Sequence, residues 1–402
     1  MTINNEHKKL NVPNLRFPEF KGEWEEKRVS EIADLFKGNG ISKEQLTDTG
    51  EPCILYGELY TKYKSEIISD IFSKTDIDTR KLVKSKANDV IIPCSGETAV
   101  DIATARCVPY DNILLGGDLN IIRLYDCDGS FMSYQLNGKR KYDIAKVAQG
   151  VSVVHLYGDH LKGVKTYNPC LEEQKKIVRL LSLLDERIAT QNKVIEDLKK
   201  LKCAIIDYTI DSIQADYTEF ETMYVAAGEG GTPSTSKKEY YENGRIPFVK
   251  IENLKQKYLV SNKDYITELG LQKSSAWLIP TNSILFSNGA TIGEISITTY
   301  PVCTKQGILG IVPKADIDTV YLYYLMSSRY FKKEICRIIT EGTMKTAYLK
   351  DINKIRCPIP SKAVQQEIVR IPSALNTKIE TEQSILNKLI CQKQYLLRQM
   401  FI

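Results

Sequence analysis

Residues 171–208 read LEEQKKIVRLLSLLDERIATQNKVIEDLKKLKCAIIDY and contain neither proline nor glycine. Apolar residues recur there in alternating steps of four and three, which is the heptad pattern of a coiled-coil helix. A second such run ends the chain, and a helix of about 37–40 residues would extend about 55–60 Å. Because so long an apolar stripe needs a partner, we expect the two helices to pack antiparallel. The expected seam residues are Ile177, Leu181, Leu184, Ile188, Ile195, Leu198, Leu375, Ile379, Leu386, Leu389 and Leu396.

The two helical runs belong to an internal repeat. Residues 169–210 align with residues 360–401 without a gap, and 11 of the 42 positions are identical. Pro372 replaces the seam residue Leu181, so the second helix is expected to bend there or to begin its straight section after it. A repeat near 190 residues predicts two tandem domains and not a solenoid. The polar interruptions of the seam also align, Gln191 with Glu382 and Lys202 with Lys393.

The regions outside the helical runs are rich in Tyr, Ile, Val and Thr, with frequent glycine turns. Short strands should dominate, with helical stretches such as Thr319–Ile338. In both regions an apolar run leads into a glycine turn, Ser95-Gly96 or Asn288-Gly289, and predicts strand, tight turn and strand. The predicted fold is α+β: two tandem α+β domains joined by two long antiparallel coiled-coil helices, with a pseudo-twofold internal repeat. The expected boundaries are 1–21 for an N-terminal extension, 22–168 for the first domain, 169–210 for the central helix, 211–360 for the second domain and 361–402 for the C-terminal helix.

Composition narrows the function classes. The chain has 402 residues, 43% apolar and 26% charged, and its longest apolar runs are only a few residues. With a polar N-terminus as well, we expect a cytoplasmic protein without a membrane span. Ten cysteines form no CxxC pair, which argues against a zinc ribbon and a secreted disulfide framework. The net charge of +5 falls entirely in residues 211–402, so if nucleic acid is the ligand, other subunits should supply part of the phosphate contact.

No set of residues assembles a nucleophile with a base. Phe36-Lys37-Gly38-Asn39-Gly40 matches the FxGxG loop that holds S-adenosylmethionine in many DNA methyltransferases, but the Asn/Asp-Pro-Pro-aromatic segment that such an enzyme needs is missing. Glu173-Gln174-Lys175 offers the Glu-x-Lys of a nuclease without its strand aspartate, and we interpret it as a solvated helix face. His155 and His160 lack the spacing of a zinc pair on one helix face. We therefore predict no catalytic residue and no metal site.

Two divergent α+β domains, each followed by a long helix of shared sequence, resemble the specificity subunit of type I restriction–modification complexes. The order of the matching segments carries the resemblance, which covers nearly the whole chain. Those segments are 12–20 (VPNLRFPEF), 23–25 (EWE) and 148–156 (AQGVSVVHL) in the first domain, 230–234 (GGTPS), 246–249 (IPFV) and 288–293 (NGATIG) in the second, and 169–174 and 360–367 at the openings of the two helices. The second helix departs from the family in lacking the Glu-Gln pair and in containing Pro372.

The resemblance implies a non-catalytic subunit that recognises double-stranded DNA. Each domain would read one half of a bipartite target, and the helices would set the gap and dock two methylation subunits. Those subunits would bring S-adenosylmethionine, and two restriction subunits would bring ATP with magnesium, so this chain would bind no cofactor itself. Two alternatives stay open: a single-chain DNA methyltransferase with fused recognition domains, and a coiled-coil adaptor without a DNA function.

Base reading requires donors and acceptors on loops that can enter a groove of the duplex. In the first domain the predicted DNA contacts are Lys37, Asn39, Ser42, Lys43, Tyr56, Glu58, Ser95, Glu97 and Thr98. In the second they are Thr232, Ser234, Lys237, Lys238, Asn288, Thr291, Lys305, Gln306, Thr343 and Lys345. The pairs Ser42-Lys43 and Lys237-Lys238 suit phosphates, whereas Asn39 and Asn288 suit base edges or turns. The alternative for each residue is a solvated loop position or a turn former.

Overall fold

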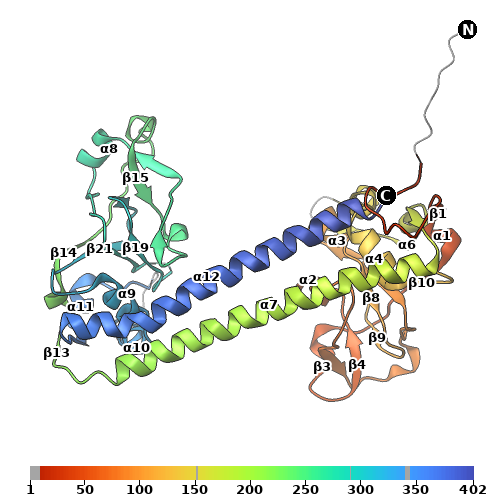
Figure 1. Cartoon of the computed structure of the whole chain (residues 1–402), viewed down its shortest axis with the longest axis horizontal. Helices are drawn as coiled ribbons and strands as arrows, with labels where there is room; N and C mark the ends of the chain where they lie inside the picture. The colour runs from red at the N-terminus through yellow and green to blue at the C-terminus, as the bar shows by residue number, and fades with distance from the viewer. Residues whose placement is uncertain (1–9, 151–152, 290, 340–344) are drawn as a thin grey trace, which may run out of the picture. The chain divides into compact units, whose positions relative to one another are not determined.

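The computed structural model describes residues 10–150, 153–289, 291–339 and 345–402 (Figure 1). It divides into two compact units, unit 1 (Met1–Lys193 and Ser384–Ile402) and unit 2 (Val194–Gln383). The division crosses two long helices, α7 (Leu171–Asp211) and α12 (Lys362–Gln399). Each unit therefore contains one domain and a stretch of both helices. Among the described residues, no helix is both long and apolar enough to span a membrane.

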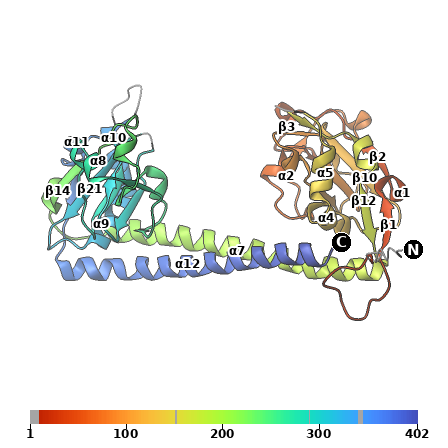
Figure 2. The same cartoon turned by 90° about the horizontal axis from the view of Figure 1, so that it is seen from above.

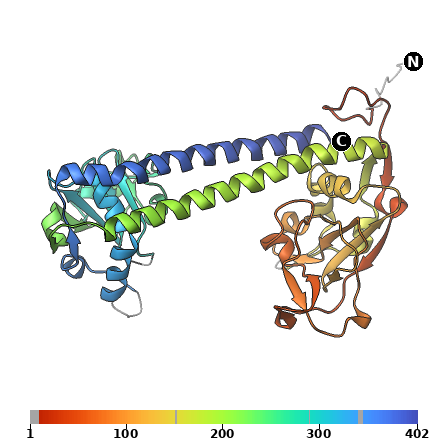
Figure 3. The same ribbon diagram turned by 60° about the horizontal axis from the view of Figure 1, so that its bottom comes forward.

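The two long helices pack antiparallel within each unit, as predicted (Figures 2 and 3). In unit 1 the start of α7 lies beside the end of α12, where Leu181 shares an apolar cluster with Leu396. In unit 2 the end of α7 lies beside the start of α12, where Ile206 packs in one cluster with Ile368. All eleven predicted seam residues are buried or half-buried, so the heptad pattern identified the packed face correctly.

Helix α12 runs without interruption through Pro372. Pro372 is buried, as is Leu181 at the aligned position of the first repeat. The helix begins well before the proline, at Lys362, so the proline does not mark its start. A proline inside a helix removes one backbone hydrogen bond, and α12 keeps its helical course across that missing bond.

The first domain is built around a four-stranded antiparallel sheet with strand order β2-β10-β6-β8. A second sheet has the order β3-β5-β4-β9, and two short pairs are β1-β12 and β7-β11. The strands are β1 (Glu25–Arg28), β2 (Ala33–Lys37), β3 (Leu46–Thr47), β4 (Glu51–Ile54), β5 (Ser73–Thr75), β6 (Asp89–Pro93), β7 (Ser95–Gly96), β8 (Arg106–Val108), β9 (Leu114–Leu115), β10 (Leu119–Leu124), β11 (Val154–His155) and β12 (Lys165–Asn168). The helices are α1 (Val29–Ile32), α2 (Glu58–Thr61), α3 (Ala99–Ile102), α4 (Gly129–Asn137), α5 (Lys141–Val147) and α6 (Gly158–Lys162), with 3-10 turns η1 (Lys43–Gln45) and η2 (Thr79–Lys81).

The second domain repeats this plan. Its main sheet has the order β14-β21-β18-β19-β16, its second sheet β17-β15-β20, and its short pair is β13-β22. The strands are β13 (Tyr217–Glu219), β14 (Tyr224–Glu229), β15 (Ile246–Val249), β16 (Tyr258–Leu259), β17 (Asp264–Ile266), β18 (Ile284–Ser287), β19 (Ile295–Thr298), β20 (Cys303–Thr304), β21 (Ile308–Pro313) and β22 (Arg356–Pro358). The helices are α8 (Glu268–Gln272), α9 (Thr319–Ser327), α10 (Arg329–Ile338) and α11 (Leu349–Ile352), with 3-10 turns η3 (Phe220–Met223), η4 (Lys238–Tyr240) and η5 (Ile251–Asn253). The predicted α+β repeat is thus present in both halves of the chain.

Alternation along the central strands explains why each main sheet is covered on both faces. Val90 and Ile92 of β6 belong to the cluster that contains α4, whereas Ile91 between them belongs to the cluster under β4 and α2. Ile284 and Leu285 of β18 divide in the same way between two clusters. Successive side chains of a strand point to opposite faces, so one apolar run can supply two cores.

One sequence prediction about local structure was wrong and two others were confirmed. The Ser95-Gly96 turn does not form a hairpin, because α3 follows it and β6 pairs instead with the later strand β8. The equivalent strands β18 and β19 do form an antiparallel pair around the Asn288-Gly289 turn, as predicted. The helical stretch expected over Thr319–Ile338 is present as two helices, α9 and α10, because the Ser328 hydroxyl accepts the Phe331 amide and starts the second one.

One glutamine attaches each domain to its long helix. In α7, the side-chain oxygen of Gln174 accepts the backbone N–H of Asp128, the residue that caps α4, at 2.9 Å. In α12, the side-chain oxygen of Gln365 accepts the backbone N–H of Asp318, which caps α9, at 2.7 Å. Each amide nitrogen donates back to the proline that precedes its helix, at 2.9 Å in both units. The two domains are therefore mounted on their helices by the same hydrogen bonds.

Candidate nucleic-acid interface

Three loops meet at one end of the main sheet in unit 1. They follow β2, β6 and β9, and we call residues 37–39, 94–98 and 116–118 the first strand-end surface. The Cys94 amide donates to the Asp118 carbonyl at 2.7 Å, and the Ser95 hydroxyl donates to the Asp118 carboxylate at 3.2 Å. The Lys37 amine lies 3.9 Å from the same carboxylate. These contacts bring predicted residues from separate parts of the sequence to one place.

Unit 2 has an equivalent second strand-end surface, formed by residues 229–232, 287–289 and 305–307. The Asn288 amide donates to the Gly307 carbonyl at 3.0 Å, and the Gln306 amide donates to the Thr232 hydroxyl at 3.3 Å. Lys305 lies in the same loop and its side chain is exposed. The structure thus gathers the predicted residues Thr232, Asn288, Lys305 and Gln306 at one end of the second main sheet.

Backbone packing explains the glycines at both surfaces. A Cβ on Gly38 would lie 2.0 Å from the carbonyl oxygen of Gly116, and a Cβ on Gly230 would lie 2.3 Å from that of Thr304. Both glycines therefore allow close approach of two backbone segments. In the FxGxG match at residues 36–40, this packing accounts for Gly38, and Gly40 has a positive φ of 43°. Backbone geometry therefore explains both glycines without a bound cofactor.

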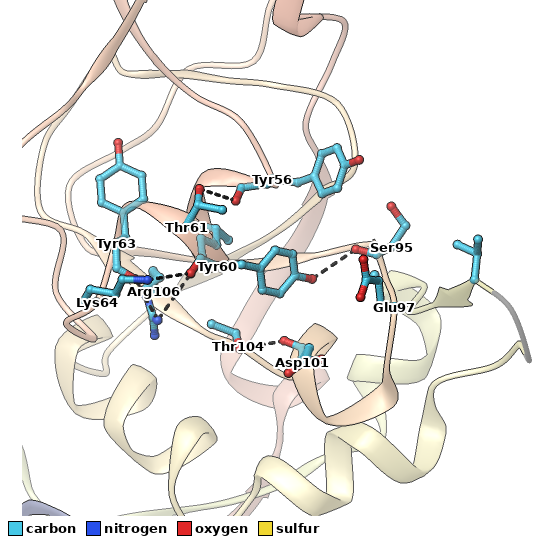
Figure 4. A pocket seen from close by; sticks show the side chains of 14 residues that line it. Tyr56, Tyr60, Thr61, Tyr63, Lys64, Ser95, Glu97, Asp101, Thr104 and Arg106 are labelled. Carbon is cyan, nitrogen blue, oxygen red and sulfur yellow. Dashed lines mark hydrogen bonds between the residues drawn. The ribbon is translucent and has the colours of Figure 1, made fainter. Parts of the chain in front are cut away.

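A cavity of about 720 Å³ adjoins the first strand-end surface (Figure 4). Its wall combines tyrosines of the α2 region, among them Tyr56 and Tyr60, with the carboxylates of Glu97 and Asp101. The Tyr60 hydroxyl donates to the Ser95 carbonyl at 3.1 Å, and burial raises the pKa of Tyr60. Aromatic faces that stack and carboxylates that accept from amino groups are both suited to nucleobases.

Two cavities adjoin the second strand-end surface, with volumes of about 520 and 590 Å³. Thr232, Lys250 and Lys305 line both of them. The Lys250 amine pairs with Asp264 at 2.9 Å, and this hydrogen bond raises the pKa of Lys250. The Asp264 carboxylate holds the Lys250 amine in place, whereas the side chain of the neighbouring Lys305 is exposed.

Most of the predicted contact residues are exposed. These are Lys37, Asn39, Ser42, Lys43, Tyr56, Glu97, Thr98, Ser234, Lys237, Lys238, Thr291, Lys305, Gln306 and Lys345, while Thr232 is half-buried. Some also have local structural roles: Thr98 caps α3, Ser42 belongs to the capping box of η1, and the Asn39 amide donates to the Lys81 carbonyl at 3.0 Å. Their DNA contacts remain predictions. Thr343 lies outside the described residues.

Three predicted residues are buried, contrary to the expectation of exposed loop side chains. The Glu58 side chain accepts from the Leu55 amide at 3.0 Å and from the Lys62 amine at 2.7 Å, so it stabilises the start of α2. Ser95 is 9% exposed and bonds within the strand-end surface. Asn288 is 2% exposed, and its side-chain amide donates to the Ala347 carbonyl at 3.3 Å. These side chains shape the loops from within.

The interpretation of Glu173-Gln174-Lys175 as a solvated face was wrong for two of its residues. Glu173 and Gln174 are 1% and 2% exposed. The guanidinium of Arg16 donates two hydrogen bonds to the Glu173 carboxylate, both at 2.8 Å, and this pairing raises the pKa of Arg16. Trp24 packs beside them and donates to Glu173 at 3.4 Å. The buried Glu173 therefore anchors the N-terminal segment on α7.

Sequence reasoning missed several residues of the cavity walls. Tyr60 and Lys64 follow Tyr56 at helical spacing, which is a signal that could have been used. Arg106 also lines the first cavity, although its side chain donates to the Tyr63 carbonyl at 3.0 Å and burial lowers its pKa. Nothing in the sequence around Arg106 marks it as a cavity residue.

A protein-family model, curated proteins and a solved structure all match this chain over large parts of its length. Residues 21–200 and 224–390 match the family model described as "Type I restriction modification DNA specificity domain". The MjaVIII type I restriction enzyme specificity subunit of Methanocaldococcus jannaschii is 24% identical over 92% of this chain and 90% of its own length. The EcoR124I/EcoR124II specificity subunit of Escherichia coli is 28% identical over 52% of this chain, but the match spans only 55% of that protein. The crystal structure of the S subunit from M. genitalium has the same fold, with a TM-score of 0.60 and 18% identity over 97% of this chain and 99% of the other.

Proposed function

Because the chain belongs to the type I restriction–modification DNA specificity family, we propose that it recognises double-stranded DNA as the specificity subunit of such a complex. Each domain reads one half of a bipartite target through its strand-end surface. The observation that carries this proposal is the repeat itself: two equivalent scaffolds place different polar side chains at the same sheet end. The duplicated frame supports a shared binding mode, and the differing loops support different sequences.

The proposed partners follow from the family. Two methylation subunits dock around the paired helices and bring S-adenosylmethionine, and two restriction subunits bring ATP with magnesium. The paired helices set the gap between the two half-sites. The complex acts in the cytoplasm, and this chain contributes recognition while the other subunits carry out the chemistry. Phosphate contacts from the partners complement the modest net charge of +5.

The test uses the chain assembled with its methylation subunits. Lys305 and Lys314 lie just before and just after β21, so they mark opposite ends of one strand. Replacing a phosphate-contacting lysine reduces the salt slope of DNA binding by about 1. We expect this reduction for Lys305→Ala and an unchanged slope for the matched Lys314→Ala.

Sequence specificity has its own readout. Gln306→Ala should relax the half-site read by the second domain and leave the other half-site intact, as measured by methylome sequencing of a host carrying each variant. A protein that supports no methylation of any bipartite site, in reconstitution or in the host, would refute the proposed function. Methylation by the chain alone would favour the methyltransferase alternative instead.

A further inference from the structure

Two equivalent positions of the repeats carry opposite charges. The Glu66 carbonyl accepts the Cys107 amide at 2.8 Å, and the Lys257 carbonyl accepts the Ile297 amide at 2.8 Å. The residue that follows each forms a parallel bridge to the matching strand, β8 in unit 1 and β19 in unit 2. Glu66 and Lys257 therefore occupy the same place in the two domains, next to the long helices.

In unit 1 this place contains its own anions. The Lys393 amine forms ion pairs with Glu66 and, at 2.6 Å, with Asp185. The Tyr134 hydroxyl also donates to Asp185 at 2.7 Å. Two carboxylates thus surround one amine, and all three charged side chains are at most 14% exposed.

In unit 2 the same place has two amines, and the carboxylate nearby, Glu380, reaches them only through the Asn376 side chain, from which it accepts a hydrogen bond at 2.7 Å. Lys202 and Asn376 align with Lys393 and Asp185, and the Lys202 amine donates to the Asn376 side chain at 3.1 Å. The Lys257 amine donates to the hydroxyls of Tyr324 and Ser373, both at 3.2 Å. Within the described part of the chain, the hydrogen bonds of both amines go to neutral side chains. Burial accordingly lowers the pKa of both lysines, that of Lys257 to about 8.

A cavity of about 650 Å³ opens beside these two amines, between α7, α9 and α10. Lys202 and Tyr324 form part of its wall, and Lys255, Lys332 and Lys333 add further cations. In total five cationic side chains face two carboxylates. One of those carboxylates, Asp207, is already engaged, because it accepts the Arg329 amide at 2.7 Å. Arg329 is the fifth cation, and its guanidinium lies 3.6 Å from the Asp211 carboxylate, but the side chains of the wall still carry more positive than negative charge.

The rest of the wall indicates the kind of ligand. Ile206, Leu254, Ile295 and Tyr323 contribute apolar surface between the cations. The phosphate backbone of a duplex offers anions but no apolar side chains, so it would leave the apolar part of this wall uncovered. An extended protein segment can place both carboxylates and apolar side chains there, and charge complementarity of this kind favours a specific partner.

We propose that this cavity of unit 2 binds a segment of a methylation subunit that carries acidic and apolar side chains. The partner's carboxylate supplies in trans the negative charge that Glu66 and Asp185 supply within unit 1. This inference rests on the proposed function, since the partner comes from the complex, but it concerns assembly and not base reading. The two docking places on this chain are accordingly unequal.

Charge reversal tests the proposal on the full chain. Lys332→Glu/Lys333→Glu should weaken binding of the methylation subunit to one of its two places about tenfold, measured by native mass spectrometry and analytical ultracentrifugation. Lys263→Glu/Lys273→Glu makes the same change in net charge on exposed residues of unit 2 outside the cavity and should bind normally. Asn376→Asp, which copies unit 1 at a half-buried position, should weaken the same place.

Cross-linking identifies the ligand chemistry. A carbodiimide joins an amine to a nearby carboxylate, so it should link Lys255, Lys332 or Lys333 to an aspartate or glutamate of the methylation subunit. Two results would overturn the proposal: full occupancy of both places by the reversed variant, or normal subunit binding with weakened DNA binding, which would assign the cavity to the phosphate backbone. If the unaltered chain binds no methylation subunit, the proposed function itself fails, and that outcome is distinct from either.

Discussion

Lys393 of α12, a polar residue within the helix seam of unit 1, provides a quantitative test of the paired helices. Lys393 forms ion pairs with Glu66 of the domain and Asp185 of α7, and the three side chains are only 9–14% exposed. Removing one partner from a buried ion pair costs about 3–5 kcal/mol, because the remaining charge stays buried without compensation. For a unit of this size, 1 kcal/mol lowers the melting temperature by about 2–4 °C. We therefore expect Lys393→Met to lower the melting temperature of unit 1 by about 6–20 °C.

The repeat supplies the matched control. Lys202 holds the aligned position in α7, but its amine is bonded to the neutral side chain of Asn376. Lys202→Met leaves no buried carboxylate unpaired, so it should cost only about 1 kcal/mol, the net value of an ordinary hydrogen bond. Asp185→Asn should recover part of the loss in Lys393→Met, because it removes one uncompensated charge.

The measurement must report on each unit separately, since two compact units need not unfold together. Hydrogen exchange followed by mass spectrometry can monitor amides of α4 in unit 1 and α9 in unit 2. Lys393→Met should accelerate exchange in α4 and leave α9 unchanged. Equal destabilisation by Lys393→Met and Lys202→Met would refute the reasoning, because it would mean that the buried carboxylates of unit 1 do not depend on their lysine.

Three further predictions concern single side chains. Gln365→Ala should destabilise the attachment of α9 to α12 by about 1–3 kcal/mol, since it leaves the Asp318 amide and the Pro360 carbonyl without their partner; faster hydrogen exchange at the start of α9 would show it. Because burial lowers the pKa of Lys257 from 10.5 to about 8, the unfolded chain holds a proton that the folded unit releases between these values, and stability rises with pH across that window. Relative to Lys257→Met, the unaltered chain should gain about 2 kcal/mol in denaturant titrations between pH 7 and pH 9.5. Arg16→Met should leave the buried Glu173 carboxylate without its charge partner and cost about 3–5 kcal/mol, with limited proteolysis reporting release of the N-terminal segment.

Periodicity and repetition in the sequence predicted the larger features correctly. The alternation of three- and four-residue steps identified α7, α12 and their buried faces, because helix amphipathicity follows directly from local spacing. The ungapped alignment predicted two domains of one plan, and the matching sheet orders show that plan. The family resemblance rested on the order of short segments, and the match over residues 21–200 and 224–390 supports it.

The errors arose where a contact joins distant parts of the chain. Glu58 looks like a loop carboxylate in sequence, but the hydroxyl of Ser73, a residue of β5, donates to it and it is buried. Glu173 looks like a solvated helix residue, and only the fold brings Arg16 to it. The Ser95-Gly96 turn failed as a hairpin because β6 prefers a partner beyond the next helix. Local propensity contains no information about any of these pairings.

The same comparison explains how one scaffold can present two different reading surfaces. The glutamine that mounts each domain accepts a backbone N–H of that domain, so this attachment depends little on which side chains the reading loops carry. The position of Glu66 and Lys257 differs from this attachment, because there a side chain of the domain contacts the helices directly. Glu66 pairs with Lys393 in unit 1. Lys257 bonds to Tyr324 and Ser373 in unit 2. Exchange of reading loops should therefore be tolerated, whereas a domain transplanted with the wrong charge at this position should lose stability on its new helices.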